Sequence, residues 1–294
     1  ILILGAGGML GHKLAFLLNK NFEIYTTTRS PYSLYKKFEI FDPNRHIDQL
    51  DVLDESALSL AVKKIEPRVI INCVGLTTRK IDTQDSSLVI KTNSLLPHNL
   101  TAIAKRIKAR VIHFSTDCVF SGSKGNYKES DLTDSRDLYG LSKVLGEVNH
   151  EPCLTLRSSI IGREILHHTE LLEWLVSMQD QQVRGFSRVY YTGVTTNLMV
   201  KVVEDIILNH PELFGVYQLA SPKISKYELL NLINEALQLN VSIQSDSQYQ
   251  SDKSLDGSRL AKIVQSADKI TWEDMIVDLI KEDKRYKKWK YNDT

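Results

Sequence analysis

Cysteine is scarce in this sequence, and long hydrophobic runs are missing from it. The three cysteines, Cys73, Cys118 and Cys153, form no CxxC pair, which excludes a disulfide framework and a zinc site of the usual spacing. We expect free thiols and therefore a reducing, cytoplasmic location. The apolar runs, such as 69–74, have the length of buried strands and not the ~18 residues of a membrane span. No charged leader precedes an apolar stretch, so the sequence predicts no membrane partner.

An excess of charge of one sign is also missing. The 294 residues include 37 Lys and Arg against 36 Asp and Glu, a formal net charge of +1, which argues against a nucleic-acid partner bound through charge. No cluster of His, Cys or acidic residues has the spacing of metal ligands, so we predict no bound metal. Hydrophobic residues make up 42% and charged residues 25% of the chain, the balance of a globular protein with a sizeable core.

Short apolar runs alternate with helical patterns through the first half of the chain. The predicted strands are 1–4, 22–27, 69–74, 111–114 and 154–156, and the predicted helices are 9–19, 54–64, 93–105 and 137–148. This alternation is typical of an α/β fold, a doubly wound parallel sheet with helices on both faces. Helices dominate the rest, at 169–178, 197–208, 225–237 and 271–282, with a short strand at 215–220. We predict two domains, 1–160 and a smaller, mainly helical lobe, 161–294, which is interleaved with the first.

A glycine-rich turn follows the first predicted strand. Gly5, Gly8 and Gly11 have the spacing GxxGxxG, and a helical pattern begins at Met9. Glycines allow a phosphate to approach the free N–H groups at the start of a helix. We therefore predict that these glycines, with Met9 and Leu10, bind the diphosphate of a dinucleotide, which makes 1–160 a Rossmann-type domain.

The end of the second predicted strand indicates which dinucleotide binds. An acidic residue there would bind the ribose 2′-hydroxyl of NAD, but the run 26–30 contains none. Arg29 and Ser30 could instead hold the 2′-phosphate of NADP. We predict NADPH as the cofactor, with NADH as an alternative, and Arg29 could also be an ordinary exposed loop arginine.

Other predicted cofactor contacts lie where later strands end or the next helix begins. Asp51 could accept a hydrogen bond from the adenine amino group, or it could be a loop residue beside the helix cap Asp54. The remaining predicted contacts of the dinucleotide are Val52, Cys73, Val74, Gly75, Asn93 and Ser115. A dinucleotide lies across the carboxyl edge of such a sheet, where these residues emerge.

A tyrosine and a lysine supply the candidate catalytic pair. Tyr139 and Lys143 are four residues apart, on one face of a predicted helix. An ammonium favours the phenolate, so we expect Lys143 to lower the pKa of Tyr139 and to let it move a proton to or from a carbonyl oxygen. Thr116 follows the strand 111–114 and could hydrogen-bond the same oxygen.

These motifs together resemble those of the extended short-chain dehydrogenases/reductases, most closely the dTDP-4-dehydrorhamnose reductase type. The resemblance rests on the glycine turn, Asp51, the run Ser115–Phe120, the pair Tyr139 and Lys143, and the run 156–159. It implies a Rossmann domain with a small sugar-nucleotide lobe. It also implies Thr116, Tyr139 and Lys143 as the catalytic set, which would use NADPH to reduce the C4 ketone of a nucleotide-linked 4-keto-6-deoxy sugar. Tyr139 and Lys143 would also contact the cofactor, with Lys143 hydrogen-bonded to the nicotinamide ribose. That reaction belongs to deoxysugar and cell-surface polysaccharide biosynthesis.

The resemblance also suggests where the nucleotide sugar binds. Cys118 and Phe120 lie in the catalytic run, and Cys118 stands where the family usually has tyrosine. Arg188 or Arg259 could hold the nucleotide diphosphate bidentately, and either could equally be an exposed loop arginine. A homodimer is a further possible partner.

Two alternatives stay open. In the GDP-L-fucose synthases, bifunctional epimerase–reductases, a cysteine two residues after the catalytic hydroxyl works with a later histidine, and Cys118 with His167 or His168 resembles that pair. Cys118 could instead be a small buried apolar side chain. The other alternative is a non-catalytic NADP-binding regulatory subunit, like one of methionine adenosyltransferase, although the intact catalytic set argues against it.

Overall fold

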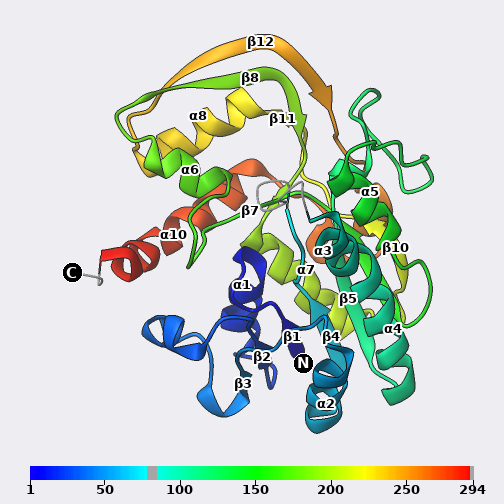
Figure 1. The fold of residues 1–294 in the computed structure, drawn as a ribbon. Helices are drawn as coiled ribbons and strands as arrows, with labels where there is room; N and C mark the ends of the chain where they lie inside the picture. The colour runs from blue at the N-terminus through cyan, green and yellow to red at the C-terminus, as the bar shows by residue number, and fades with distance from the viewer. Residues whose placement is uncertain (78–84, 292–294) are drawn as a thin grey trace.

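Seven parallel strands form the central sheet of the computed structural model, which describes residues 1–77 and 85–291. The strand order is β10-β6-β5-β4-β1-β2-β3 (Figure 1). The strands are β1 Leu2–Leu4, β2 Tyr25–Thr27, β3 His46–Ile47, β4 Val69–Asn72, β5 Arg110–Ser115, β6 Cys153–Arg157 and β10 Gly215–Gln218. The order reverses direction between β1 and β4, so the predicted doubly wound parallel sheet is confirmed. The carboxyl ends of β1 and β4 flank its switch point, where such sheets bind ligands.

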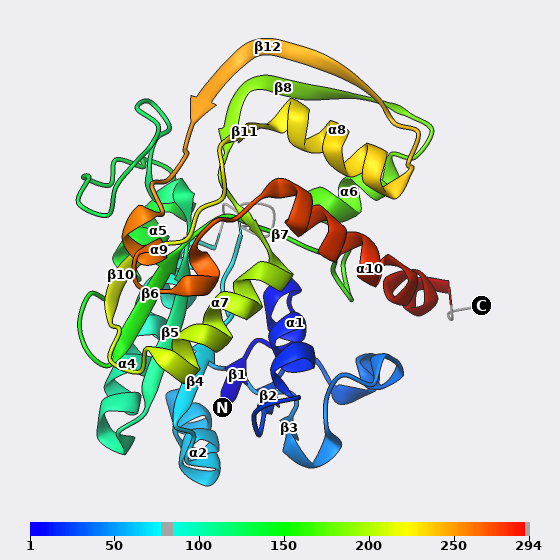
Figure 2. The same ribbon diagram turned by 180° about the vertical axis from the view of Figure 1, so that it is seen from behind.

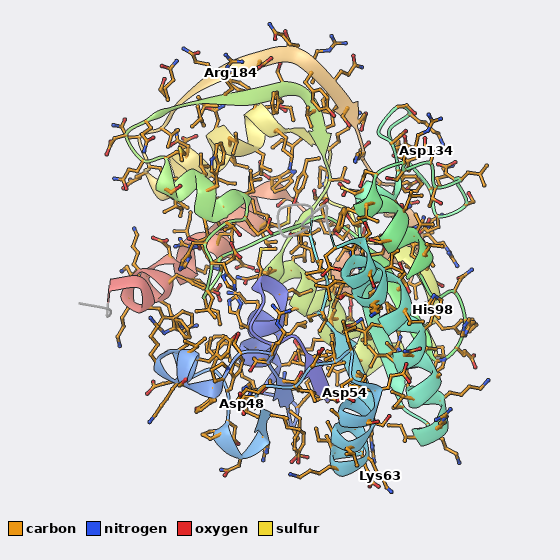
Figure 3. All side chains as sticks on the ribbon, viewed as in Figure 1. Asp48, Asp54, Lys63, His98, Asp134 and Arg184 are labelled. Atoms are coloured by element: carbon orange, nitrogen blue, oxygen red, sulfur yellow. The ribbon has the colours of Figure 1, made fainter. Side chains whose placement is uncertain are left out.

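Strand side chains alternate between two helical layers, because successive residues of a strand point to opposite faces. Leu2 and Leu4 belong to an apolar cluster with α2 (Glu55–Ile65) and α4 (Leu96–Ile107). Ile3 belongs to the other cluster, with α1 (Met9–Leu18) and α7 (Thr196–Asn209). The polar face of α2, which carries Lys63, points to solvent (Figure 3).

The remaining helices differ from the predicted ones mainly in where they begin and end. They are α3 Ser86–Ile90, α5 Leu138–Leu145, α6 Leu171–Ser177, α8 Lys226–Leu237, α9 Ser258–Ala261 and α10 Trp272–Tyr291. The helix predicted at 93–105 begins earlier, because α3 continues through the π-helical turn Lys91–Leu95 into α4. Helix α10 runs nine residues beyond its predicted end at residue 282. Within residues 1–77 and 85–291, no helix is long and apolar enough to cross a membrane.

Two long strands arch over α8 and were not predicted (Figure 2). Strand β8 (Gln182–Tyr191) pairs with β12 (Ser242–Asp252) in parallel and with β11 (Ile224–Ser225) in antiparallel orientation. Most of β12 is exposed and polar, so it lacks the alternating apolar pattern by which a strand is predicted. The lobe is therefore more than the predicted group of helices. The short strands β7 (Ile160–Ile161) and β9 (Val194–Thr195) pair beneath it.

The second half of the chain returns to the central sheet. Strand β10, predicted at 215–220, pairs with β6 and forms one edge of that sheet. Helix α7 covers the same face as α1. The two parts of the chain therefore share one core, and a domain boundary at residue 160 stays a prediction.

Close packing of α1 on the glycine turn generates a stability prediction. A Cβ at Gly11 would collide with the Gly5 carbonyl oxygen and lie 2.8 Å from Cα of Ala6, whereas one at Gly8 would lie 3.5 Å from that oxygen. We expect Gly11→Ala to lower the free energy of unfolding by about 1–3 kcal/mol, and Gly8→Ala to have a smaller effect. Urea denaturation of both variants checks this; equal losses would contradict it.

Candidate active site

The glycine turn is built for close approach to the backbone. Gly5 has φ +73°, and a Cβ there would lie 3.0 Å from Cγ2 of Val74. Helix α1 begins after Gly8, and no side chain caps its first turn. The N–H groups at the start of a helix have no partner within it, and they attract anions. The turn and Val74 thus fit the predicted diphosphate site at the switch point.

Tyr35 covers this turn, which the sequence did not indicate. A Cβ at Gly7 would collide with the Tyr35 hydroxyl, so the phenol lies directly on the glycine loop. Burial raises the pKa of Tyr35, and a hydrogen bond with Ser30 and the charge of Arg29 oppose that rise. In the sequence, the contact of Tyr35 with the glycine turn was indicated only by the presence of an aromatic residue in the loop after β2.

The residues predicted to select the cofactor lie around the end of β2 and the start of α2. Arg29 is exposed and Ser30 half-buried, and the Thr28 hydroxyl donates to the Ser30 carbonyl oxygen at 2.8 Å. Asp51 and Val52 line a cavity of about 500 Å³, in which one Asp51 carboxylate oxygen accepts from the Leu53 N–H at 3.0 Å. Such a cavity has room for an adenine, and the roles of these residues stay predictions.

The predicted contacts on β4 and the following helix are placed differently. Gly75 is exposed, and Cys73 and Val74 are half-buried after β4; burial raises the pKa of Cys73 and keeps its thiol neutral. The Asn93 side chain accepts from the Leu76 N–H at 2.9 Å, and it donates to the Leu76 carbonyl oxygen at 3.0 Å and to Ser142 Oγ at 3.1 Å. Asn93 therefore holds the loop after β4 against α5, and its contact with the cofactor stays a prediction.

Thr116 and Tyr139 meet at the carboxyl end of β5. Thr116 Oγ1 donates to Asp117 Oδ1 at 3.1 Å and accepts from the Cys118 N–H at 3.1 Å. Burial raises the pKa of Tyr139, the neighbouring Cys118 adds to the rise, and the nearby Thr116 hydroxyl opposes it. The expected lowering of that pKa is therefore wrong for this structure, because loss of water and the neighbouring Asp117 and Glu170 carboxylates all raise it.

Lys143 lies on the same helix as Tyr139. Its buried ammonium donates to the Phe114 carbonyl oxygen at 2.6 Å. Burial lowers the pKa of Lys143 to about 8, and the Glu147 carboxylate opposes the shift. Near neutral pH the side chain is mostly charged, so it keeps a cation beside the end of β5.

Glu147 links Ser115 to an arginine. It accepts from the Ser115 hydroxyl at 2.7 Å and forms a two-pronged ion pair with Arg157, both contacts at 2.7 Å. Ser115 is therefore hydrogen-bonded to Glu147 in this structure, and its predicted cofactor contact stays a prediction. The Arg157 guanidinium lies 5.2 Å from the ring centre of Phe120. Phe120 belongs to a small buried apolar cluster.

Phe120 is a core residue and not a substrate contact. It is 0% exposed, and its ring stacks on Tyr127 with centroids 4.1 Å apart. Its aromatic face is already covered, which corrects the prediction.

The geometry does not assemble the proposed epimerase pair. Burial raises the pKa of Cys118 to about 12, and Asp117 adds to the rise, so the thiol stays neutral. Exposed His167 and His168 line a cavity with Tyr286 on α10, and His168 Nδ1 lies 3.3 Å from a Glu173 carboxylate oxygen. No contact joins either histidine to Cys118 within the described residues.

Glu170 and Tyr191 reach the site from the second lobe. Asp117, Cys118 and Glu170 all act on the pKa of Tyr139, and Glu170 accepts from the Thr77 hydroxyl at 3.3 Å. Tyr191, at the end of β8, is buried, and Asp117 and Cys118 contribute to raising its pKa. Glu170 and Tyr191 lie far from Tyr139 in the sequence, and Glu170 carried no motif.

The two arginines predicted for the diphosphate have other partners. Arg188, exposed on β8, donates to Gln250 of β12. Arg259 donates to the Val216 carbonyl oxygen at 3.1 Å and lies 4.1 Å from the ring centre of Tyr217. Both roles stay predictions. No group of three or more His, Cys, Asp or Glu residues among those described could hold a metal ion.

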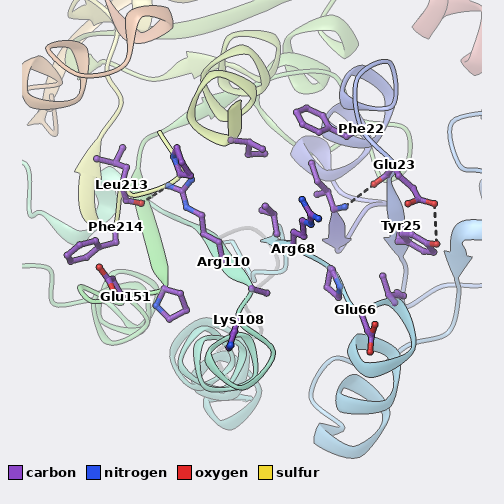
Figure 4. Close-up of a pocket in the computed structure, with 18 of the residues that line it drawn as sticks. Phe22, Glu23, Tyr25, Glu66, Arg68, Lys108, Arg110, Glu151, Leu213 and Phe214 are labelled. Carbon is purple, nitrogen blue, oxygen red and sulfur yellow. Dashed lines mark hydrogen bonds between the residues drawn. The ribbon is translucent and has the colours of Figure 1, made fainter. Parts of the chain in front are cut away.

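A separate cavity of about 870 Å³ lies at the opposite edge of the sheet (Figure 4). Its lining includes Tyr25, Arg68, Arg110 and Phe214, at or just before the amino ends of strands. Arg110 donates to the Leu213 carbonyl oxygen at 2.5 Å. This cavity is remote from the carboxyl edge, which holds the candidate site.

The buried ion pair beside Ser115 yields a second stability prediction. The side chains of Glu147 and Arg157 are 8% and 6% exposed, so Glu147→Ala leaves a buried charge without its partner. We expect a loss of about 3–5 kcal/mol in the free energy of unfolding. In the surface pair Lys201–Asp278, Lys201 is 60% exposed, and Lys201→Ala should cost at most about 1 kcal/mol. Chemical denaturation measures both; similar losses would refute the prediction.

Comparisons with known proteins agree with this architecture. Residues 1–271 match the family described as RmlD substrate binding domain. A dTDP-4-dehydrorhamnose reductase of Aggregatibacter actinomycetemcomitans is 26% identical over 251 residues, 81% of this chain and 79% of the relative. Methionine adenosyltransferase 2 subunit beta of Xenopus laevis is 26% identical over 211 residues, 65% of this chain and 60% of that protein.

Solved structures show the same fold. A hypothetical dTDP-4-dehydrorhamnose reductase from Sulfolobus tokodaii superposes with a TM-score of 0.72 and 27% identity, over 89% of this chain and 93% of the other. The Bacillus anthracis dTDP-4-dehydrorhamnose reductase in complex with NADP superposes with a TM-score of 0.77 over 96% and 98%, and at 19% identity it shows the fold alone. Because the family match runs from the glycine turn almost to α10, this chain belongs to the RmlD substrate binding domain family.

Proposed function

We propose that this protein uses NADPH to reduce the C4 ketone of a nucleotide-linked 4-keto-6-deoxy sugar, in deoxysugar biosynthesis. The observation that carries the proposal is the meeting of Thr116, Tyr139 and Lys143 at the carboxyl end of β5, on the sheet edge that also carries the glycine turn. The names of the reductases among its relatives support the same substrate class.

The side chains suit a reduction. NADPH supplies the hydride when bound. Burial keeps the Tyr139 phenol protonated near neutral pH, so it can donate its proton to the oxygen that forms at C4. The Thr116 hydroxyl lies near that phenol and opposes the rise in its pKa. The Lys143 ammonium stabilises negative charge beside the pair.

The cofactor contacts and domain division are part of the proposal. The glycine turn with Met9 and Leu10 would hold the diphosphate, Arg29 and Ser30 the 2′-phosphate, and Asp51 with Val52 the adenine. Residues 1–160 would form the cofactor domain, and residues 161–294 would supply Glu170 and Tyr191 to the sugar site.

A homodimer and a cytoplasmic location are also proposed. Leu141 and Leu145 on α5 are 45% and 62% exposed, and a second copy would cover them. The three cysteines are free thiols, which suits a reducing compartment.

A regulatory subunit is the second candidate. It is favoured by the similarity to methionine adenosyltransferase 2 subunit beta, whereas the assembled catalytic set favours an enzyme. Under this alternative the protein would bind NADPH, turn over no sugar and act through a partner.

Turnover by a Tyr139→Phe variant separates these candidates. We expect NADPH consumption with a panel of nucleotide-linked 4-keto-6-deoxy sugars, and a loss of about a hundredfold to ten-thousandfold in kcat when the proton donor is removed. NADPH affinity should be unchanged. Tyr249→Phe, which alters a tyrosine 59% exposed on β12, is the control. Run in heavy water, the same assay should give a product with no deuterium bound to carbon. Deuterium on a carbon beside the former ketone would indicate that epimerisation precedes reduction.

Tight NADPH binding without turnover of any sugar would instead support the regulatory subunit.

The pKa of Lys143 predicts a pH dependence. Its value of about 8 means that the ammonium is lost as pH rises through this range, so kcat/KM should fall above pH 8. Lys143→Arg keeps a charge there and should lose this descending limb, whatever its absolute rate. Rate profiles between pH 6 and pH 10 test this. The same fall in both proteins would show that another group titrates.

A further inference from the structure

We propose that the C-terminal helix α10 sets the affinity for NADPH, and that His12 and Tyr286 are positioning residues for the glycine turn. The inference rests on the proposed cofactor. Helix α10 begins at Trp272, just beyond the family match at residue 271, so its contribution is not part of what the family match covers. It lies beside α1 in both views of the fold (Figures 1 and 2).

Two hydrogen bonds, the His12 bridge, connect α10 to the turn. His12 Nδ1 lies 2.8 Å from the Gly8 carbonyl oxygen, and His12 Nε2 lies 2.6 Å from the Tyr286 hydroxyl. A carbonyl oxygen can only accept, so Nδ1 carries the proton and donates to Gly8. Burial and the neighbouring Lys13 lower the pKa of His12 to about 3, so the ring is neutral. Nε2 therefore accepts from the Tyr286 O–H.

The bridge acts on the peptide that opens α1. The Gly8 carbonyl oxygen also accepts from the backbone N–H of His12 at 3.1 Å, so two donors fix its direction. A peptide unit is planar, with its C=O and N–H pointing opposite ways. Holding the Gly8 carbonyl toward His12 therefore aims the Met9 N–H away from the helix, toward the position predicted for the diphosphate. An N–H group that already points at the phosphate position loses no conformational entropy when the phosphate binds.

Buried ion pairs hold α10 in place for this contact. The ammonium of Lys13, on α1 and 3% exposed, pairs with Glu282 and lies 4.9 Å from the ring centre of Tyr286. Arg163 pairs with Asp283 at 2.6 Å and with Glu173 at 2.7 Å. The Arg163 guanidinium lies 5.4 Å from the ring centre of Tyr286, so two cations that are themselves paired to α10 lie close to that ring.

Affinity for NADPH in the absence of any sugar tests the bridge, with fluorescence titration as the readout. Tyr286→Phe removes one hydroxyl, and we expect binding about fivefold to tenfold weaker. His12→Asn keeps a donor near the position of Nδ1 but loses the contact with Tyr286, so it should bind as weakly as Tyr286→Phe. His12→Gln places its amide near Nε2 and loses the contact with Gly8, so it should bind as weakly as Tyr286→Phe or more weakly. At saturating NADPH, kcat should be unchanged in all three. Asp278→Asn breaks an exposed ion pair between α10 and α7 and should leave affinity unchanged.

The outcomes are distinct. Weaker binding by Tyr286→Phe, His12→Asn and His12→Gln, with Asp278→Asn near wild type, supports the bridge. Wild-type affinity in Tyr286→Phe and His12→Gln would overturn it and leave these residues a purely stabilising role. Equal weakening by Asp278→Asn would also overturn it, because general loosening of α10 would then suffice. Failure of the sugar panel alone leaves this result intact, whereas a wild-type protein that does not bind NADPH would overturn both proposals.

Discussion

The contact between Gly11 of α1 and the carbonyl oxygen of Gly5 is the constraint on which the site depends. It allows the helix to rest directly on the turn that follows β1, with no side chain between them. That approach places the uncapped start of α1 at the switch point of the sheet and presents the helix's other side to α7 and α10. Cofactor site and core are thus fixed by the same backbone contact.

Around the catalytic groups, burial is the largest influence on each pKa. The pKa of Tyr139 and that of Cys118 are raised, and that of Lys143 is lowered, with loss of water as the largest cause in each case. Glu147 moderates this by holding Lys143 partly charged while pairing with Arg157. A neutral phenol beside a cation is the state needed to give a proton to an oxygen that gains negative charge.

The same balance explains the ionic cluster under α10. Burying a charge is costly unless it is paired, and Arg163 has two carboxylate partners, one of them on α10. The helix therefore belongs to the folded core despite its many charged residues, and its aromatic side chains reach α1 and the loop after β2, where Phe38 meets Trp289.

The sequence by itself determined the features that depend on short stretches of chain: the strand–glycine turn–helix at its start, the alternating strands, and the four-residue spacing of Tyr139 and Lys143. These follow from local periodicity and from the special conformations of glycine. Strand β12 was not predicted, because it is stabilised by backbone pairing with β8 and has no apolar face that the sequence would show. Phe120 was predicted to contact the substrate, because the sequence does not show that Tyr127 stacks on its ring. Only the tertiary structure could bring Tyr286 to His12, 274 residues away, because such a contact depends on how whole layers pack, and no local pattern records it.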